Sequence, residues 1–131
     1  MNEEVQRHLQ KAREALTDAE LLLAQGSPEA TVNRAYYAMF HAASAMHLAE
    51  GRKYVRHGEM IGNFNRLFVH EGKEVEPSFF EMLQSAFGLR DAADYAADGI
   101  RTVSRESAAA KVRDAREFLA MAVAYLKTKE P

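Results

Sequence analysis

Three stretches of the sequence carry side chains that could bind or cleave a phosphate ester. In the first, Asn33, Tyr37, His41 and Ser44 are spaced four, four and three residues apart. On a helix this spacing places them on one face, where a phenol and an imidazole in line could bind a phosphate or a base. Arg34 lies seven residues before His41 and so nearly shares that face. The alternative is a polar face against solvent, or aromatic rings packed at a boundary between helices.

The second stretch carries Lys53, Tyr54, Arg56 and His57 close together. Cations interleaved with an aromatic residue are typical of segments that hold phosphate and stack on a base. The stretch leads into the N-terminus of an expected short helix, where free N–H groups favour anions. The alternative is a solvated loop that Tyr54 and Val55 pin to the bundle.

The third stretch places Arg90 and Asp94 in register with an apolar stripe of Phe80, Leu83 and Phe87. Burying either charge alone would cost several kcal/mol, but the two are four residues apart and can pair. Tyr95 lies next to them and is a further candidate. Charges on such a stripe indicate an ion pair between helix residues, an interface or a ligand site. The structural alternative is an internal ion pair that only fixes the helix register.

These side chains must be positioned by helices, which the spacing of apolar residues predicts. Apolar residues recur at steps of four and three in the first and last expected helices. These stripes are Val5, Leu9, Ala12, Leu16, Ala19 and Leu23, and Ala108, Val112, Ala115, Leu119, Ala122 and Leu126. No stretch alternates with period two, so no strand is expected. The sequence therefore predicts an all-α fold, an antiparallel up-and-down four-helix bundle with one additional short helix.

The expected helix boundaries follow from capping signals. Asn2 would cap the first helix, and the Ser27 hydroxyl would cap the second, which runs to about residue 50. A short helix is expected over residues 58–68, followed by a turn at residues 70–73. Pro77 would open a helix to residues 98–99, and Ser104 would cap the last one. The chain then forms one domain over residues 1–131, with residues 128–131 as a frayed tail.

Composition excludes several classes of protein. The 131 residues contain no cysteine, so disulfides and thiolate metal sites are absent. No Glu-x-x-His pair and no Gly-rich phosphate loop occurs, so we expect no metal site and no cofactor. The N-terminus does not resemble a signal peptide and no stretch is apolar enough for a membrane span, which favours a cytoplasmic protein.

Charge is unevenly distributed. The net charge of −2 argues against duplex DNA as the ligand. Residues 51–73 nevertheless hold five Lys and Arg against two acids, whereas residues 74–98 hold six acids against one Arg. A basic patch beside an acidic one suits a phosphate ligand or the meeting of two subunits, although both could be solvated faces.

Residues 33–43, NRAYYAMFHAA, resemble the "raYYAmfhaa" segment of prokaryotic HEPN-domain proteins. Residues 89–95 resemble the "lR-x-x-aDY" signature of that family, and residues 115–119 its "A-x-x-Fl" helix. His57 followed by Ile61 and Phe64 looks like the intervening block. The resemblance implies a helical bundle, commonly a homodimer with a cleft between protomers. It also implies a minimal nucleotidyltransferase as partner, in a toxin–antitoxin pair.

Active members of the family are described as metal-independent ribonucleases with an Arg-x(4–6)-His motif. In that scheme Arg90 would steady the scissile phosphate and a histidine would take the proton of the attacking 2′-hydroxyl. This sequence departs from the motif, because Tyr95, Ala96 and Ala97 occupy the positions where the histidine would fall. Tyrosine is a poor base at neutral pH. His57 could enter the same site from another helix, since chemistry requires proximity in space.

Three hypotheses follow for the function. The first is a homodimeric nucleotide- or RNA-binding partner of a minimal nucleotidyltransferase. The second is an active endoribonuclease toxin, and the third a structural or dimerisation module. The candidate catalytic residues are Arg90, Asp94, Tyr95 and His57, and the candidate binding residues are Arg34, Tyr37, His41, Lys53 and Arg56.

Overall fold

The structure, a computed structural model, describes residues 1–94 and 103–130, without the side chains of residues 92–94. Every regular element in this part of the chain is helical. The elements are α1 (Glu3–Ala24), α2 (Pro28–Ala49), α3 (His57–Phe64), the π-helix η1 (Asn65–Glu71), α4 (Pro77–Asp94) and α5 (Arg105–Thr128).

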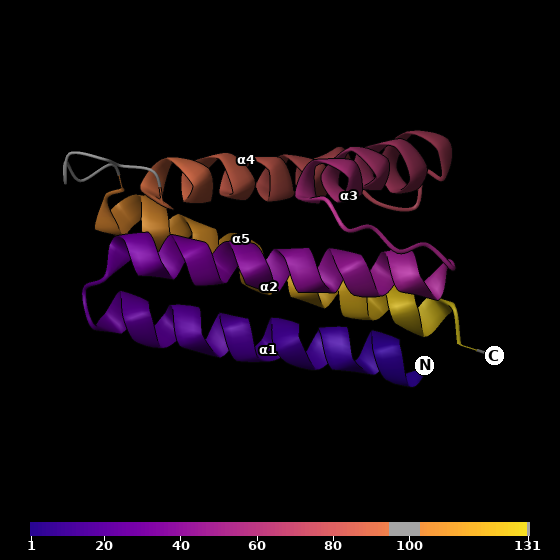
Figure 1. Ribbon diagram of the computed structural model, residues 1–131, viewed down its shortest axis with the longest axis horizontal. Coiled ribbons are helices and arrows are strands. Elements are labelled where there is room, and N and C mark those ends of the chain that lie inside the picture. Colours follow the sequence, from indigo (N-terminus) through magenta and orange to yellow (C-terminus); the bar gives the residue numbers. More distant parts are fainter. Residues whose placement is uncertain (95–102, 131) are drawn as a thin grey trace.

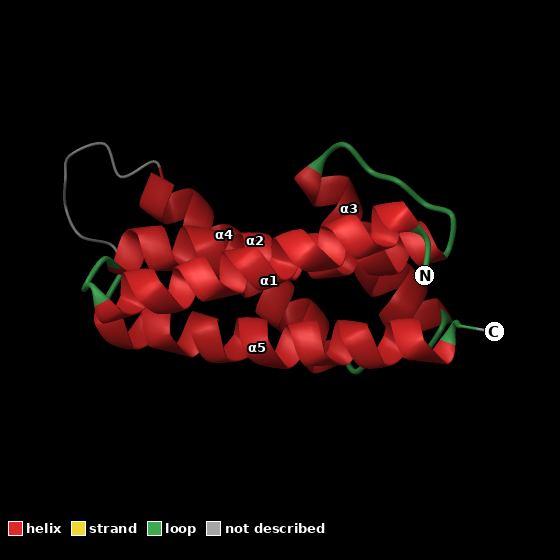
Figure 2. Cartoon of the chain, turned by 90° about the horizontal axis from the view of Figure 1, so that it is seen from below, coloured by secondary structure: helices red, strands yellow, loops and turns green. Residues whose placement is uncertain are grey.

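The four long helices run alternately up and down, and both chain termini lie at the same end of the bundle (Figure 1). Helices α3 and η1 pack beside α4, and the loop before α3 crosses back along the bundle (Figure 2). This arrangement confirms the predicted all-α bundle with one additional short helix. Among the described helices, none has the length and apolarity to cross a membrane.

Helix α2 lies at the centre of the bundle. It contacts α1, α3, α4 and α5, and twelve of its residues are buried. Five of these are alanines with no exposed surface: Ala35, Ala38, Ala42, Ala43 and Ala45. Small side chains allow the neighbouring helices to approach closely from several directions, so the polar residues of α2 must find partners within the protein.

Capping explains where the first two helices begin. The Asn2 side chain accepts a hydrogen bond from the Val5 amide at 2.8 Å, as predicted. The chain then turns at Gly26, whose φ of +79° favours glycine. Ser27 precedes α2 as expected, but its hydroxyl makes no capping bond, contrary to the prediction. Instead the Ser27 carbonyl accepts a hydrogen bond from the Thr31 hydroxyl at 2.7 Å.

The segment after α2 differs from the prediction. A helix over residues 58–68 and a turn from His70 were expected, whereas α3 passes at Asn65 into a π-helix that ends at Glu71. The wider turn buries both Phe68 and Val69. It also brings Arg66 and Glu71, five residues apart, to 2.9 Å. The prediction was wrong because it assumed an α-helical period throughout.

The C-terminal segment is held against the bundle. Ser104 caps α5 as predicted, accepting from the Ser107 amide at 3.0 Å. Thr128 is the last residue of α5, and the expected fraying of residues 128–131 stays a prediction. Lys129 donates to Glu74 at 2.9 Å and lies over the Tyr125 ring.

The buried stripe of α5 includes a residue that the predicted stripe omitted. Phe118 is fully buried and packs against Phe64 and Phe79, with ring centroids 5.5 and 6.1 Å apart. Leu119, which was predicted to be in the core, is only partly buried.

We expect Phe118→Ala to lower the free energy of unfolding by about 3–5 kcal/mol, because it removes an aromatic side chain from the core and leaves a cavity. Urea denaturation monitored by circular dichroism measures this loss. The control is Leu21→Ala, since Leu21 is 58% exposed and its truncation should change stability by about 0.5 kcal/mol or less. Equal effects of the two substitutions would contradict the assignment of Phe118 to the core.

Candidate functional site

Arg90 meets two adjacent tyrosines of α2. Its guanidinium donates to the Tyr37 hydroxyl at 3.3 Å. It also lies 5.6 Å from the centre of the Tyr36 ring and 5.4 Å from that of Tyr37. Cation–π contacts of this kind stabilise a partly buried cation. The predicted Arg90 therefore projects from the apolar stripe of α4 onto the aromatic pair of α2.

His57 reaches the same tyrosine pair from the start of α3. Its Nδ1 lies 2.7 Å from the Tyr36 hydroxyl oxygen. The imidazole stacks on Phe40 with ring centroids 4.4 Å apart, and Phe87 lies 6.0 Å away. Arg90 and His57, 33 residues apart in the sequence, thus both contact Tyr36.

The surroundings determine the charge of these groups. Burial, and then the neighbouring Arg90 cation, lower the pKa of His57 below its ordinary value. Burial raises the pKa of Tyr36, more than the Arg90 cation lowers it. At neutral pH the imidazole of His57 and the phenol of Tyr36 are therefore both uncharged.

A groove between α1 and α2 continues from Tyr37. Its volume is about 370 Å³, and it is lined by Lys11, Glu14, Ala15, Asp18, Arg34, Tyr37 and His41. The Arg34 guanidinium lies over the Tyr37 ring at 4.9 Å and donates to Asn33. Arg34, Tyr37 and His41 thus share one face of α2, as their spacing predicts, and this face lines the groove.

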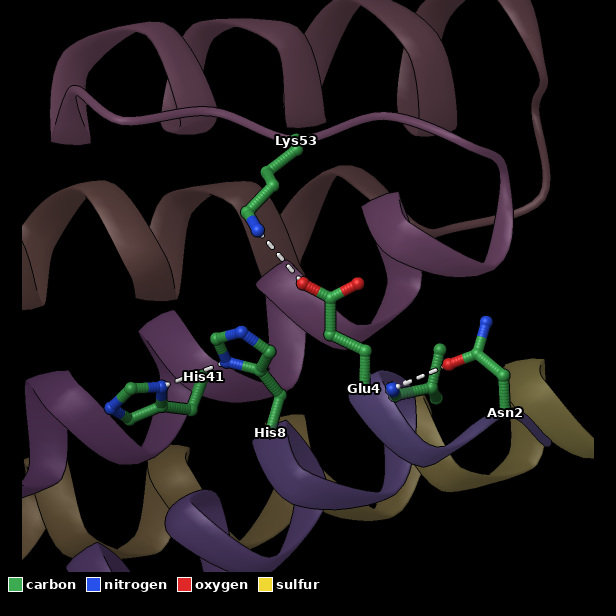
Figure 3. A network of polar contacts seen from close by, with 6 residues as sticks. Asn2, Glu4, His8, His41 and Lys53 are labelled. Atoms are coloured by element: carbon green, nitrogen blue, oxygen red, sulfur yellow. Dashed lines mark hydrogen bonds and ion pairs between the residues drawn. The ribbon is translucent and has the colours of Figure 1, made fainter.

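His41 is engaged with a residue that the sequence analysis did not single out. Its Nδ1 lies 3.1 Å from the Nδ1 of His8 on α1 (Figure 3). Burial, followed by the charges of His8 and Lys11, lowers the pKa of His41 to about 4. This contact matches the alternative interpretation, in which the ring packs at a boundary between helices.

Lys53 and Arg56 lie apart from the tyrosine pair. Lys53 donates to Glu4 at 2.8 Å and so ties the loop to α1 (Figure 3). Arg56 has an 83% exposed side chain and lies 4.0 Å from Glu59. Among the contacts of the described residues, neither side chain meets the tyrosine pair or Arg90. The remaining candidates, Tyr95 and the side chain of Asp94, lie outside the described residues.

The sequence analysis did not single out Tyr36, which both His57 and Arg90 contact. The signal was available, because a tyrosine on an apolar stripe needs a partner for its hydroxyl. Phe40, which stacks on His57, gave no such signal. Its neighbours are decided by the path of the loop that brings α3 across the bundle.

The sequence model of the HEPN domain matches residues 5–127. This chain belongs to the HEPN family. The crystal structure of a Thermus thermophilus protein, TT1696, aligns over 95% of this chain and 99% of that chain, with a TM-score of 0.81. At 22% identity that likeness shows the fold alone.

Several curated proteins resemble this HEPN domain. A UPF0332 protein of Thermotoga maritima is 40% identical over 65% of this chain and 64% of its own length. Another, from Pyrococcus horikoshii, is 41% identical over 53% of this chain and 49% of its own length. The chain thus spans 64% and 49% of the length of these two relatives. A Methanocaldococcus jannaschii protein named "Putative toxin MJ0605" is 34% identical over 75% of this chain and 72% of that protein.

A buried histidine holds the loop that leads to His57. His47 is 1% exposed, and its Nε2 lies 3.2 Å from the Met60 carbonyl oxygen. Its Nδ1 accepts a hydrogen bond from Arg52 at 3.3 Å. Both ends of the 52–60 segment are therefore anchored to α2 of the HEPN domain. Within the described residues, no group of three or more His, Cys, Asp or Glu could hold a metal ion.

The free energy of unfolding should fall as pH falls from about 6.5 to about 4. Burial lowers the pKa of His47 from 6.5 to about 4, so in this window the unfolded state binds a proton that the folded state does not. His41 contributes in the same direction. Each such histidine adds a slope of about 1.4 kcal/mol per pH unit.

Urea denaturation at several pH values measures this slope. The variant His47→Gln keeps groups that can donate to Met60 and accept from Arg52 but does not titrate. Its slope should be smaller than that of the unsubstituted protein by the contribution of one histidine. An unchanged slope would show that His47 does not enter the folded state as a neutral ring.

Proposed function

We propose that this HEPN-domain protein binds RNA or a nucleotide at the Tyr36–Tyr37 pair. The observation that carries the proposal is that Arg90 and His57 converge on this pair from different helices. A phosphate is the ligand group that a fixed guanidinium and adjacent hydrogen-bond donors recognise. The half-buried Tyr37 ring offers a face on which a base can stack.

The neighbouring residues extend the proposed site. Arg34 and His41 line the groove beyond Tyr37 and would contact the next part of the ligand. That groove also contains Glu14 and Asp18, so its balanced charge favours a base or sugar there over a second phosphate. Asp94 and Tyr95 follow Arg90 closely in the sequence, and we propose that they orient it.

The proposed biological role is that of the HEPN partner of a minimal nucleotidyltransferase in a toxin–antitoxin pair, acting as a homodimer. The names of two Methanocaldococcus jannaschii relatives, "Putative toxin MJ0605" and "Putative toxin MJ0142", support a link with toxins. Co-purification of the chain with a nucleotidyltransferase encoded next to it tests the partner. Light scattering of the purified chain tests the homodimer.

A metal-independent endoribonuclease is the second candidate function. It is favoured by the shared contact of Arg90 and His57 with Tyr36, which supplies a cation and an imidazole without the usual motif. In a ribonuclease Arg90 would stabilise the charge on the phosphate while His57 exchanged a proton.

Arg90→Ala should weaken binding of a short fluorescent oligoribonucleotide by about tenfold or more, because a charged hydrogen bond to phosphate contributes about 1.5–3 kcal/mol. Fluorescence anisotropy measures the affinity. Arg90→Lys should lose part of the affinity, since it keeps the charge but not the guanidinium fork. Arg113→Ala, at an exposed position of α5, is the matched control.

Unchanged affinity of a folded Arg90→Ala protein would refute this site. If Arg90→Ala instead unfolds the protein while a folded Arg90→Lys protein binds as tightly as the unsubstituted one, a structural role for Arg90 is favoured.

Incubation with mixed cellular RNA in the presence of a chelator separates the two candidate functions. Cleavage that is lost in both Arg90→Ala and His57→Ala would establish a ribonuclease and locate its centre. Binding without cleavage under all conditions would leave the nucleotide- or RNA-binding function.

A further inference from the structure

In the hydrogen bond between Tyr36 and His57, the hydrogen can belong to the Tyr36 hydroxyl or to Nδ1 of His57, and the surroundings favour the hydroxyl. Among the described residues, the Tyr36 hydroxyl has one hydrogen-bond partner, Nδ1 of His57 at 2.7 Å. The Arg90 guanidinium and the Tyr37 ring contact the Tyr36 ring. A guanidinium carries only donors and cannot accept the phenol hydrogen. The hydroxyl of Tyr36 is buried with its ring, so its hydrogen is directed to Nδ1 of His57.

The opposite arrangement would be unfavourable. If Nδ1 carried the hydrogen and donated to Tyr36, the buried phenol hydrogen would have no acceptor within hydrogen-bonding distance among the described residues. An unsatisfied buried donor costs about 1–3 kcal/mol. A neutral imidazole carries one hydrogen, and since Nδ1 accepts here, that hydrogen is on Nε2. The second ring nitrogen thus acts as a donor.

We propose that Tyr36 is a positioning residue that fixes His57 as the Nε2–H tautomer, so that His57 offers the ligand a neutral hydrogen-bond donor beside Arg90. The ligand group that fits is a phosphodiester, whose non-bridging oxygens accept hydrogen bonds and donate none. The tautomer is a property of the free protein, whereas the ligand class rests on the proposed function.

Packing keeps the imidazole in this position. Phe40 stacks on one face of the ring and Phe87 lies close by, so the ring is held by its neighbours as well as by its hydrogen bond. In this tautomer neither nitrogen has a free lone pair, because Nδ1 accepts from Tyr36 and Nε2 carries the hydrogen. His57 would therefore have to rearrange its protons before it could take the proton of a 2′-hydroxyl.

Nuclear magnetic resonance of the full chain with ¹⁵N-labelled histidine tests the tautomer without a ligand. At neutral pH, Nδ1 of His57 should give the signal of an unprotonated nitrogen and Nε2 that of a protonated one. The His57→Gln spectrum assigns the signals by their loss. An Nδ1–H tautomer in the unsubstituted protein would overturn the proposal, whatever the variants show.

Two matched substitutions show whether Tyr36 is the cause. Tyr36→Phe keeps the ring but removes the hydroxyl, and should shift His57 toward a mixture of the two tautomers. Tyr37→Phe removes a hydroxyl that contacts Arg90 and not His57, and should leave the tautomer unchanged. A Tyr36→Phe spectrum identical to that of the unsubstituted protein would refute the positioning role.

Binding of the same fluorescent oligoribonucleotide tests the donor. His57→Phe keeps an aromatic ring but cannot donate, and should weaken binding by about fivefold, as expected for one neutral hydrogen bond. His57→Gln can still donate and should bind more tightly than His57→Phe. Equal affinities of the two variants would refute the donor role. If the tautomer is as proposed but no variant or parent binds RNA, the proposed function fails and the tautomer assignment stands.

Discussion

The burial of α2 on nearly all sides is the constraint on which the rest of the structure depends. Four other helices pack against it, and a run of alanines lets them approach. A polar group that is buried on such a helix cannot remain hydrated, so it needs a partner inside the protein. The hydroxyl of Tyr36 meets this requirement through His57, and the ring of His47 through Met60 and Arg52.

This constraint separates the roles of two neighbouring tyrosines. Successive residues point about 100° apart around a helix, so Tyr36 faces the core while Tyr37 stays half-buried at its edge. The Arg90 guanidinium lies over both tyrosine rings. It therefore lies between His57, which contacts Tyr36, and the groove in which Arg34 lies over Tyr37. The guanidinium can lie on the apolar stripe of α4 because aromatic faces and a phenol oxygen receive it.

The segment between α2 and α3 brings His57, which is distant from Tyr36 in the sequence, into contact with it. His47 fixes it at Arg52 and Met60, and Lys53 ties its middle to α1. Arg52 also lies over the ring of Phe68, which the π-helix turns into the core. These contacts bring the start of α3 to Tyr36. Most polar residues of this segment thus make structural contacts. One residue, His57, belongs to the proposed site.

The sequence by itself determined the features that depend on local periodicity and capping. The helical class, the first residue of each long helix, the shared face of Tyr37 and His41, and the unusual position of Arg90 all follow from residues a few positions apart. Tertiary structure alone decided which groups meet. Lys53 and Arg56 belong to the same stretch as His57, but Lys53 pairs with Glu4 and Arg56 lies near Glu59. His41 contacts His8 on α1. The physical reason is that helical spacing fixes a side chain's direction around its own axis, whereas its partner depends on how helices rotate and loops cross. Those are set by packing over the whole core.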